Sequence, residues 1–73
     1  MKEMFGVEGV SQKTKELERE RDRLVEELKR LDEKHKKGDI GEDTYKEDRH
    51  RIERAIVEVM DRLAQMRFLS GQV

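Results

Sequence analysis

The chain has 73 residues, 48 % of them charged, and its formal net charge is −1. It contains no cysteine and no proline, which excludes a disulfide framework and a cysteine-ligated metal site. Basic and acidic residues are interleaved, whereas a general nucleic-acid binder usually gathers its basic residues on one face. These features indicate one small domain, of a size at which a single core rarely supplies more than about 3–5 kcal/mol of stability.

Residues 1–10 differ in character from the rest of the chain. They combine apolar side chains with Gly6 and Gly9, which are expected to interrupt any helix. Two interpretations stay open for this segment. It is either a disordered tail, or an arm whose Met4 and Phe5 cover the open end of the structure that follows.

A first helix is predicted over residues 11–37, with Ser11 as its N-cap. Lysines gather in its last turn, where the helix dipole favours cations. Gly38 follows at once, and a glycine just past the last helical residue takes the left-handed conformation without a Cβ clash. The first helix is therefore expected to end at Lys37.

A turn over residues 38–41 is predicted to lead into a second helix over residues 42–69. Gly41 is expected to be the N-cap of this helix, and acidic residues follow it in the first turn, where the dipole favours them. Ile40 and Tyr45 have the spacing of a hydrophobic staple, which fixes the angle at which the chain enters a helix. The turn is therefore expected to have a defined geometry.

Both predicted helices carry an apolar seam with alternating steps of three and four residues, the heptad signature of a coiled coil. The seam residues are Leu17, Leu24, Leu28, Leu31, Tyr45, Ile52, Ile56, Val59, Leu63 and Met66. Antiparallel partners around one turn must have residue numbers with a constant sum. Here the pairs sum to 80, from His35 with Tyr45 to Leu17 with Leu63. We therefore predict an all-α fold, an antiparallel two-helix coiled-coil hairpin.

The two flanks of this seam differ. On one flank Lys34 is expected to face Asp48, and Glu20 to face Arg62, as pairs of opposite charge. Exposed pairs of this kind contribute roughly 0.2–1 kcal/mol each, so they select the register more than they stabilise the fold.

The other flank carries an apolar stripe that a lone hairpin would leave in water. Its four residues are Val25, Val57, Met60 and Ala64. Phe68 and Leu69 lie near the end of the second helix, before a short tail at residues 71–73, and are candidates for contact with a partner chain or with the N-terminal arm. The stripe predicts that two hairpins associate into a four-helix bundle.

Residues that could carry chemistry are few. Glu47 and His50 form the Glu-x-x-His spacing that helix-bundle di-iron proteins use, but the heptad phase places both on the outer side of the second helix. We interpret them as a solvated pair. No nucleophile–base arrangement and no glycine-rich phosphate loop is apparent, so we expect no enzyme activity, no metal and no cofactor.

Four polar residues occupy seam positions: Thr14, Arg21, His35 and Arg49. His35 faces Tyr45 and is interpreted as a capping histidine near the helix end, with a pH-responsive hairpin tip as the alternative. Arg21 and Arg49 are expected to reach outward along their stems to acidic neighbours, or to fix the register as buried polar groups.

The segment 31–54 resembles the short helical hairpins of the SHOCT type. The shared pattern is carried by Gly38, Ile40, Gly41, Glu42 and Tyr45. Gly41 stands where these hairpins usually have Ser, Thr or Asp as the cap. The resemblance covers about a third of the chain and implies an oligomerisation or docking module, with no catalytic residues.

We therefore expect a non-catalytic structural or interaction module that forms a homodimer or docks onto a partner protein. No apolar run approaches the roughly 18 residues of a membrane span, and the first ten residues lack a signal-peptide core, so the expected location is the cytoplasm. The alternative is a nucleic-acid-associated accessory protein that contacts phosphates through a lysine-rich tip. The residues of that tip are Lys34, Lys36, Lys37, Lys46 and Arg51.

Overall fold

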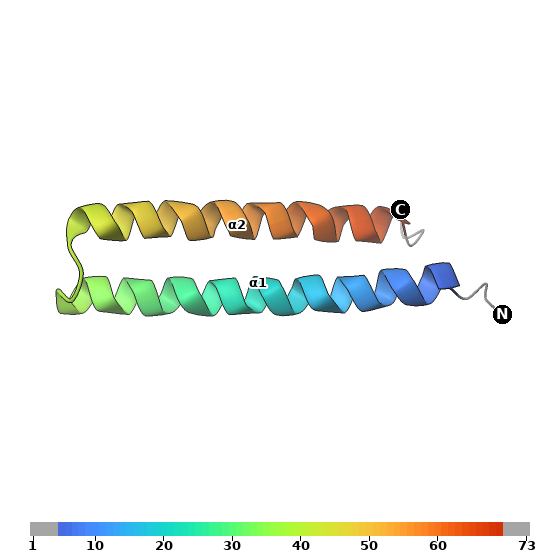
Figure 1. Ribbon diagram of the computed structural model, residues 1–73, viewed down its shortest axis with the longest axis horizontal. Helices are drawn as coiled ribbons and strands as arrows, with labels where there is room; N and C mark the ends of the chain where they lie inside the picture. Colours follow the sequence, from blue (N-terminus) through green and yellow to red (C-terminus); the bar gives the residue numbers. More distant parts are fainter. Residues whose placement is uncertain (1–4, 70–73) are drawn as a thin grey trace.

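The protein is a hairpin of two helices (Figure 1). A computed structural model describes the backbone of residues 5–69 and the side chains of residues 12–69. Helix α1 spans Phe5–Lys37 and helix α2 spans Glu42–Leu69. The helices lie side by side, with the first turns of α1 extending past the end of α2, and the molecule measures 56 × 17 × 14 Å. The prediction of an all-helical hairpin is thereby confirmed.

Helix α1 begins six residues earlier than expected. The backbone is helical from Phe5 onward, so Gly6, Gly9 and Ser11 lie within the helix, and the expected N-cap at Ser11 is wrong. Each glycine costs about 1 kcal/mol relative to alanine, but propagating an existing helix adds one hydrogen bond per residue and tolerates that cost. The proposed contacts of an N-terminal arm, made by Met4 and Phe5, lie outside the described side chains.

Helix α1 ends in a Schellman motif. The N–H of Gly38 donates to the carbonyl of His35 at 3.0 Å, and the N–H of Asp39 donates to the carbonyl of Lys34 at 2.9 Å. These are the two bonds that define the motif, and they satisfy carbonyls that the last turn leaves without a helical partner. The motif requires a left-handed residue, and Gly38 has φ +80°. The helix therefore stops because glycine alone adopts this conformation without strain.

Helix α2 starts at Glu42, four residues after Gly38. The N–H of Tyr45 donates to the carbonyl of Gly41 at 3.0 Å, which is the first helical bond and makes Gly41 the N-cap. Ile40 and Tyr45, at the staple positions, are both half-buried and pack against the core. Glu42 and Asp43 place negative charge in the first turn. The observed bounds of α2, and the end of α1, coincide with the expected ones.

The core is a single row of side chains between the helices. Its buried members are Leu17, Leu24, Leu31, Ile52, Val59 and Leu63. Half-buried neighbours packed against it are Leu28, Ile40, Tyr45, Ala55, Ile56 and Met66. Among the side chains at positions 12–69, all six buried residues belong to the seam expected from the heptad pattern. Of their half-buried neighbours, Ala55 belongs neither to that seam nor to the turn.

The two seam arginines do not place charge inside this core. Arg21 turns its guanidinium to Asp22, with Nε and Nη2 each 3.2 Å from Oδ1. Arg49 donates from Nε to Glu53 at 2.9 Å. Both therefore reach acidic neighbours along their stems, as predicted.

Candidate functional site

Two features outside the core stand out: an apolar stripe and a polar cluster at the hairpin tip. The stripe consists of Val25, Val57, Met60 and Ala64, and all four are exposed. Val57 is 60 % exposed, Met60 48 % and Val25 37 %. A small protein seldom exposes several large apolar side chains together on one face.

The stripe is continuous because of helix geometry. Val57, Met60 and Ala64 are separated by three and four residues, so they lie in one row on α2. Met60 follows the seam residue Val59, and Val25 follows the seam residue Leu24. In a hairpin, positions just after the seam on both helices lie on the same side. Val25 therefore borders the same face as the row on α2.

The end of α2 extends this apolar surface. Phe68 is 68 % exposed and Leu69 is 67 % exposed. Phe68 lies four residues after Ala64 and continues the row. Together with Ala64 and Gln65, the two residues line a shallow apolar depression. The structure thus leaves every expected interface residue accessible.

The hairpin tip is held by an aromatic stack. The rings of His35 and Tyr45 lie 3.8 Å apart between centroids and are nearly parallel, at 8°. His35 and Tyr45 are the pair nearest the turn among those that the sequence predicted to face each other, and the stack confirms that they do. Nε2 of His35 is 2.8 Å from Oε1 of Glu42, a hydrogen bond that becomes an ion pair when the imidazole is protonated. Accepting this bond lowers the pKa of Glu42 below its usual value, because it favours the carboxylate form.

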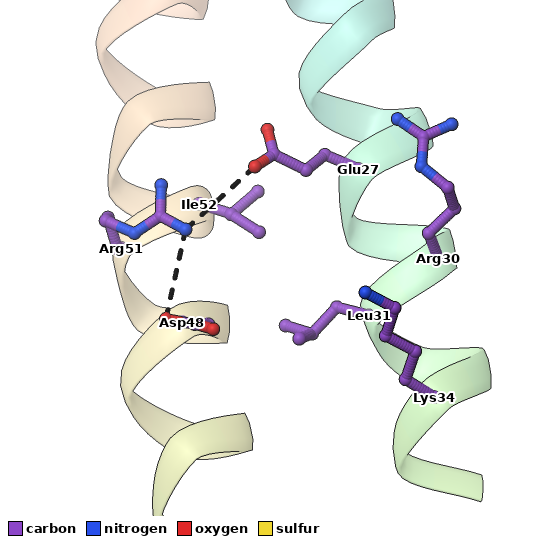
Figure 2. A pocket seen from close by; sticks show the side chains of 7 residues that line it. All are labelled: Glu27, Arg30, Leu31, Lys34, Asp48, Arg51 and Ile52. Atoms are coloured by element: carbon purple, nitrogen blue, oxygen red, sulfur yellow. Dashed lines mark ion pairs between the residues drawn. The ribbon is translucent and has the colours of Figure 1, made fainter. Parts of the chain in front are cut away.

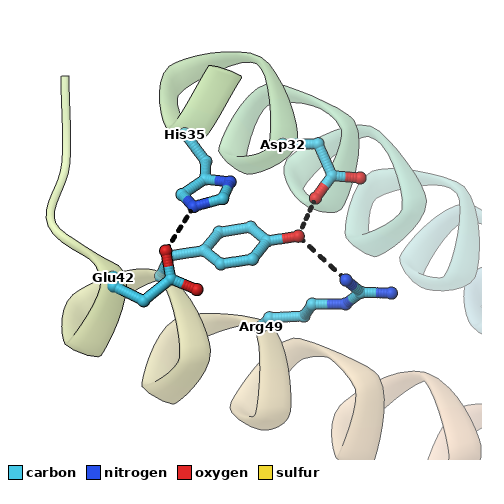
Figure 3. Close-up of polar contacts among 5 residues, drawn as sticks. Asp32, His35, Glu42 and Arg49 are labelled. Carbon is cyan, nitrogen blue, oxygen red and sulfur yellow. Dashed lines mark hydrogen bonds and ion pairs between the residues drawn. The ribbon is translucent and has the colours of Figure 1, made fainter. Parts of the chain in front are cut away.

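A second set of contacts continues from the tyrosine hydroxyl (Figure 3). The hydroxyl of Tyr45 donates to Oδ1 of Asp32 at 2.8 Å and accepts from Nη1 of Arg49, also at 2.8 Å. Donation to the Asp32 carboxylate favours the protonated phenol and raises the pKa of Tyr45. The hydrogen bond to Glu53, and then that to Tyr45, raises the pKa of Arg49. The sequence pairing placed His35 beside Tyr45 but missed Asp32 and Glu42.

The charged flank is arranged differently from the expected pairs. Arg51 lies between Glu27 of α1 and Asp48 of α2, with Nη2 3.9 Å from a carboxylate oxygen of each (Figure 2). Lys34 and Asp48, both within the described residues, do not form the expected ion pair. Asp48 instead pairs with Arg51, which lies one turn further along the same helix. The Arg51 side chain is 61 % exposed and its two acidic partners are 41–43 % exposed, so water screens both pairs and they are weak.

The second expected pair on this flank is also wrong. Glu20 pairs with Arg23, three residues on along α1, at 3.7 Å, and not with Arg62 across the hairpin. A neighbour on the same helix is nearer than a residue that must be reached from the other helix.

Exposed cations at the tip are interleaved with exposed acids. Lys36, Lys37 and Lys46 are exposed, and so are Glu42 and Asp43 between them. The mixture gives the tip no one-signed surface of the kind that binds phosphates.

The Glu-x-x-His pair lies on the outer side of α2, as its phase predicted. Glu47 and His50 are exposed and border a shallow depression with Arg54 and Glu58. Within the described side chains, no group of three His, Cys, Asp or Glu residues could hold a metal ion. Over the same part of the chain, neither helix is long and apolar enough to cross a membrane.

Comparison with known proteins gives no relative. No protein-family model matches the chain, and no curated protein or solved structure does so either. The resemblance to SHOCT-type hairpins therefore stays a prediction from the sequence pattern.

Proposed function

We propose that this chain is a non-catalytic interaction module, an antiparallel coiled-coil hairpin that forms a homodimer through the apolar stripe. The dimer would be a four-helix bundle. The observation that carries the proposal is the exposure of Val57 and Met60 in a row beside a small core, in which six of the described side chains are buried. A second copy of the same surface is the simplest partner with matching chemistry.

The energetic argument favours association. Full burial of a valine or methionine side chain contributes roughly 1.5–3 kcal/mol. Each hairpin offers Val25, Val57 and Met60, so a symmetric interface would cover three large apolar side chains per chain. A single core in this size range rarely supplies more than about 3–5 kcal/mol, so the added burial is comparable with the stability of the hairpin itself.

The resemblance to SHOCT-type hairpins supports the same proposal, because it implies oligomerisation or docking and brings no catalytic residues. We also propose a cytoplasmic location and no enzyme activity. Docking onto a different protein is the related possibility, and it would use the same stripe extended by Phe68 and Leu69.

The test is substitution of Met60 by glutamate, with the solution mass measured by light scattering over a range of concentrations. A carboxylate in the apolar interface costs several kcal/mol unless it is paired, so Met60→Glu should shift the dimer to monomer. The matched control is Gln12→Glu, which adds the same charge at an exposed position of α1 outside the stripe. A dimer that survives Met60→Glu unchanged would contradict the proposed interface.

A further inference from the structure

We infer that the two hairpins of this dimer run antiparallel, with α2 of one chain packed on α2 of the other. The midpoint lies between Val57 and Met60, so that Val57 meets Met60 of the second copy and Met60 meets its Val57. The inference rests on the proposed function and adds the arrangement of the partner. It follows from where the apolar residues and the charges lie along the stripe.

The apolar residues lie mainly on one helix. Helix α2 contributes three members of the stripe, whereas α1 contributes Val25 alone. In a dimer that placed α2 against α1 of the second copy with both tips at one end, Met60 would lie level with Glu18 and Asp22. Both carboxylates are exposed on α1 and would be buried against apolar side chains, which is unfavourable. Packing α2 on α2 buries apolar surface on apolar surface.

The charges beside the stripe then decide the direction. Arg54 and Asp61 are two helical turns apart on the same border of the row, three residues before and four residues after Val57. Neither forms an ion pair within the described part of the chain. With α2 helices parallel, symmetry would place Arg54 beside Arg54 and Asp61 beside Asp61.

With α2 helices antiparallel about the same midpoint, each Arg54 lies beside the Asp61 of the second copy, and the pair occurs twice. This is the electrostatic complementarity that selects orientation in helical assemblies. In an antiparallel pair of helices, facing residues have a constant sum of residue numbers. That sum is 117 for Val57 with Met60 and 115 for Arg54 with Asp61, so one alignment of the two helices brings both pairs together. The charges therefore select the antiparallel direction, and the apolar residues are compatible with it.

Charge reversal tests the pairing. Arg54→Asp should weaken the dimer about tenfold, because it turns two attractive exposed pairs into two repulsive ones. The double variant Arg54→Asp, Asp61→Arg exchanges the partners and should restore the dimer affinity. Arg19→Asp, the same charge change at an exposed position of α1 outside the stripe, is the control and should leave the affinity unchanged. A double variant as weak as Arg54→Asp alone would overturn the pairing.

A distance measurement tests the direction without altering the interface. The chain has no native cysteine, so Thr44→Cys carries one spin label per chain at the exposed tip. Thr44 lies about 14 residues from the midpoint, which places the two labels about 40–45 Å apart in the antiparallel dimer at 1.5 Å per residue. With the tips side by side the labels would lie about 10–20 Å apart, close to the spacing of packed helices.

The outcomes separate the inference from the proposed function. A dimer by mass with a long label distance supports both. A dimer with a short label distance overturns the antiparallel arrangement and leaves the homodimer standing. A monomer at every concentration, with no dipolar coupling between labels, overturns both.

Discussion

Substitution of Ile52 by alanine should remove most of the stability of the hairpin. Ile52 is 1 % exposed and lies in the middle of the seam. The change removes three buried carbon groups, each contributing about 0.8 kcal/mol, so the lost transfer free energy is about 2.4 kcal/mol. A cavity term adds to this, and the total falls within the range of about 2–5 kcal/mol seen for such changes. Since a core of this size supplies about 3–5 kcal/mol, little stability should be left.

Urea unfolding followed by circular dichroism measures this loss. The midpoint should move to lower urea with little change in slope, because nearly the same surface is exposed on unfolding. All variants must be compared at one chain concentration, because association makes the apparent stability concentration-dependent. Ile52→Val should lose about 1 kcal/mol, and the control Gln12→Ala, at an exposed position of α1 outside the stripe, should change stability by less than about 0.5 kcal/mol. An Ile52→Ala variant that behaves like the control would refute the assignment of Ile52 to the core.

Three further predictions concern the turn and the tip. Gly38→Ala should cost about 1–2 kcal/mol through backbone strain alone, measured by the same unfolding assay, because φ is +80° while the space for a Cβ is open. The lowered pKa of Glu42 contributes stability that is present above the unfolded pKa, near 4.5, and is lost as pH falls through the folded value. The melting temperature should therefore fall less steeply with decreasing pH in Glu42→Gln than in the unmodified protein. An equally steep fall in both would contradict this role of Glu42. The raised pKa of Tyr45 contributes stability that is present below the unfolded pKa, near 10.0, and is lost as pH rises through the folded value. In Tyr45→Phe, the melting temperature should therefore fall less steeply as pH rises above 10. If the phenol of Tyr45 titrates below pH 10 in an absorbance measurement, the hydrogen bond to Asp32 does not raise its pKa.

The arrangement of the hairpin follows from local signals in the sequence. The stop of α1 depends on Gly38, whose positive φ no other residue type adopts as readily, and the start of α2 depends on the carbonyl of Gly41. The seam follows from heptad spacing, which selects the buried face of each helix. Since each of these signals involves residues within one helix or one turn, the sequence is sufficient to locate them.

The start of α1 could not be read in the same way. Gly6 and Gly9 disfavour helix locally, yet the helix extends through them to Phe5. Single glycines lower helix stability by about 1 kcal/mol each and do not impose an end. The start of the helix therefore depends on the helix-forming free energy summed over the whole segment, and not on the propensity of any single residue.

The tip contacts were missed for a related reason. The constant-sum register compares residues at the same level, and it correctly places His35 beside Tyr45. The tyrosine hydroxyl, however, reaches along the hairpin to Asp32, about one turn from the level of its own backbone. Long side chains contact residues away from their own level. The expected pair of Lys34 with Asp48 fails for a different reason, because Asp48 pairs with Arg51 on its own helix.

The most direct test of the central proposal is the solution mass of the chain by light scattering over a range of concentrations, with helicity followed on the same samples. A homodimer through the stripe predicts twice the chain mass of 8.7 kDa, with helicity that rises as the dimer forms. A chain that keeps the monomer mass and a constant helicity at every concentration would contradict it, and the exposed row of Val57 and Met60 would then require a different partner.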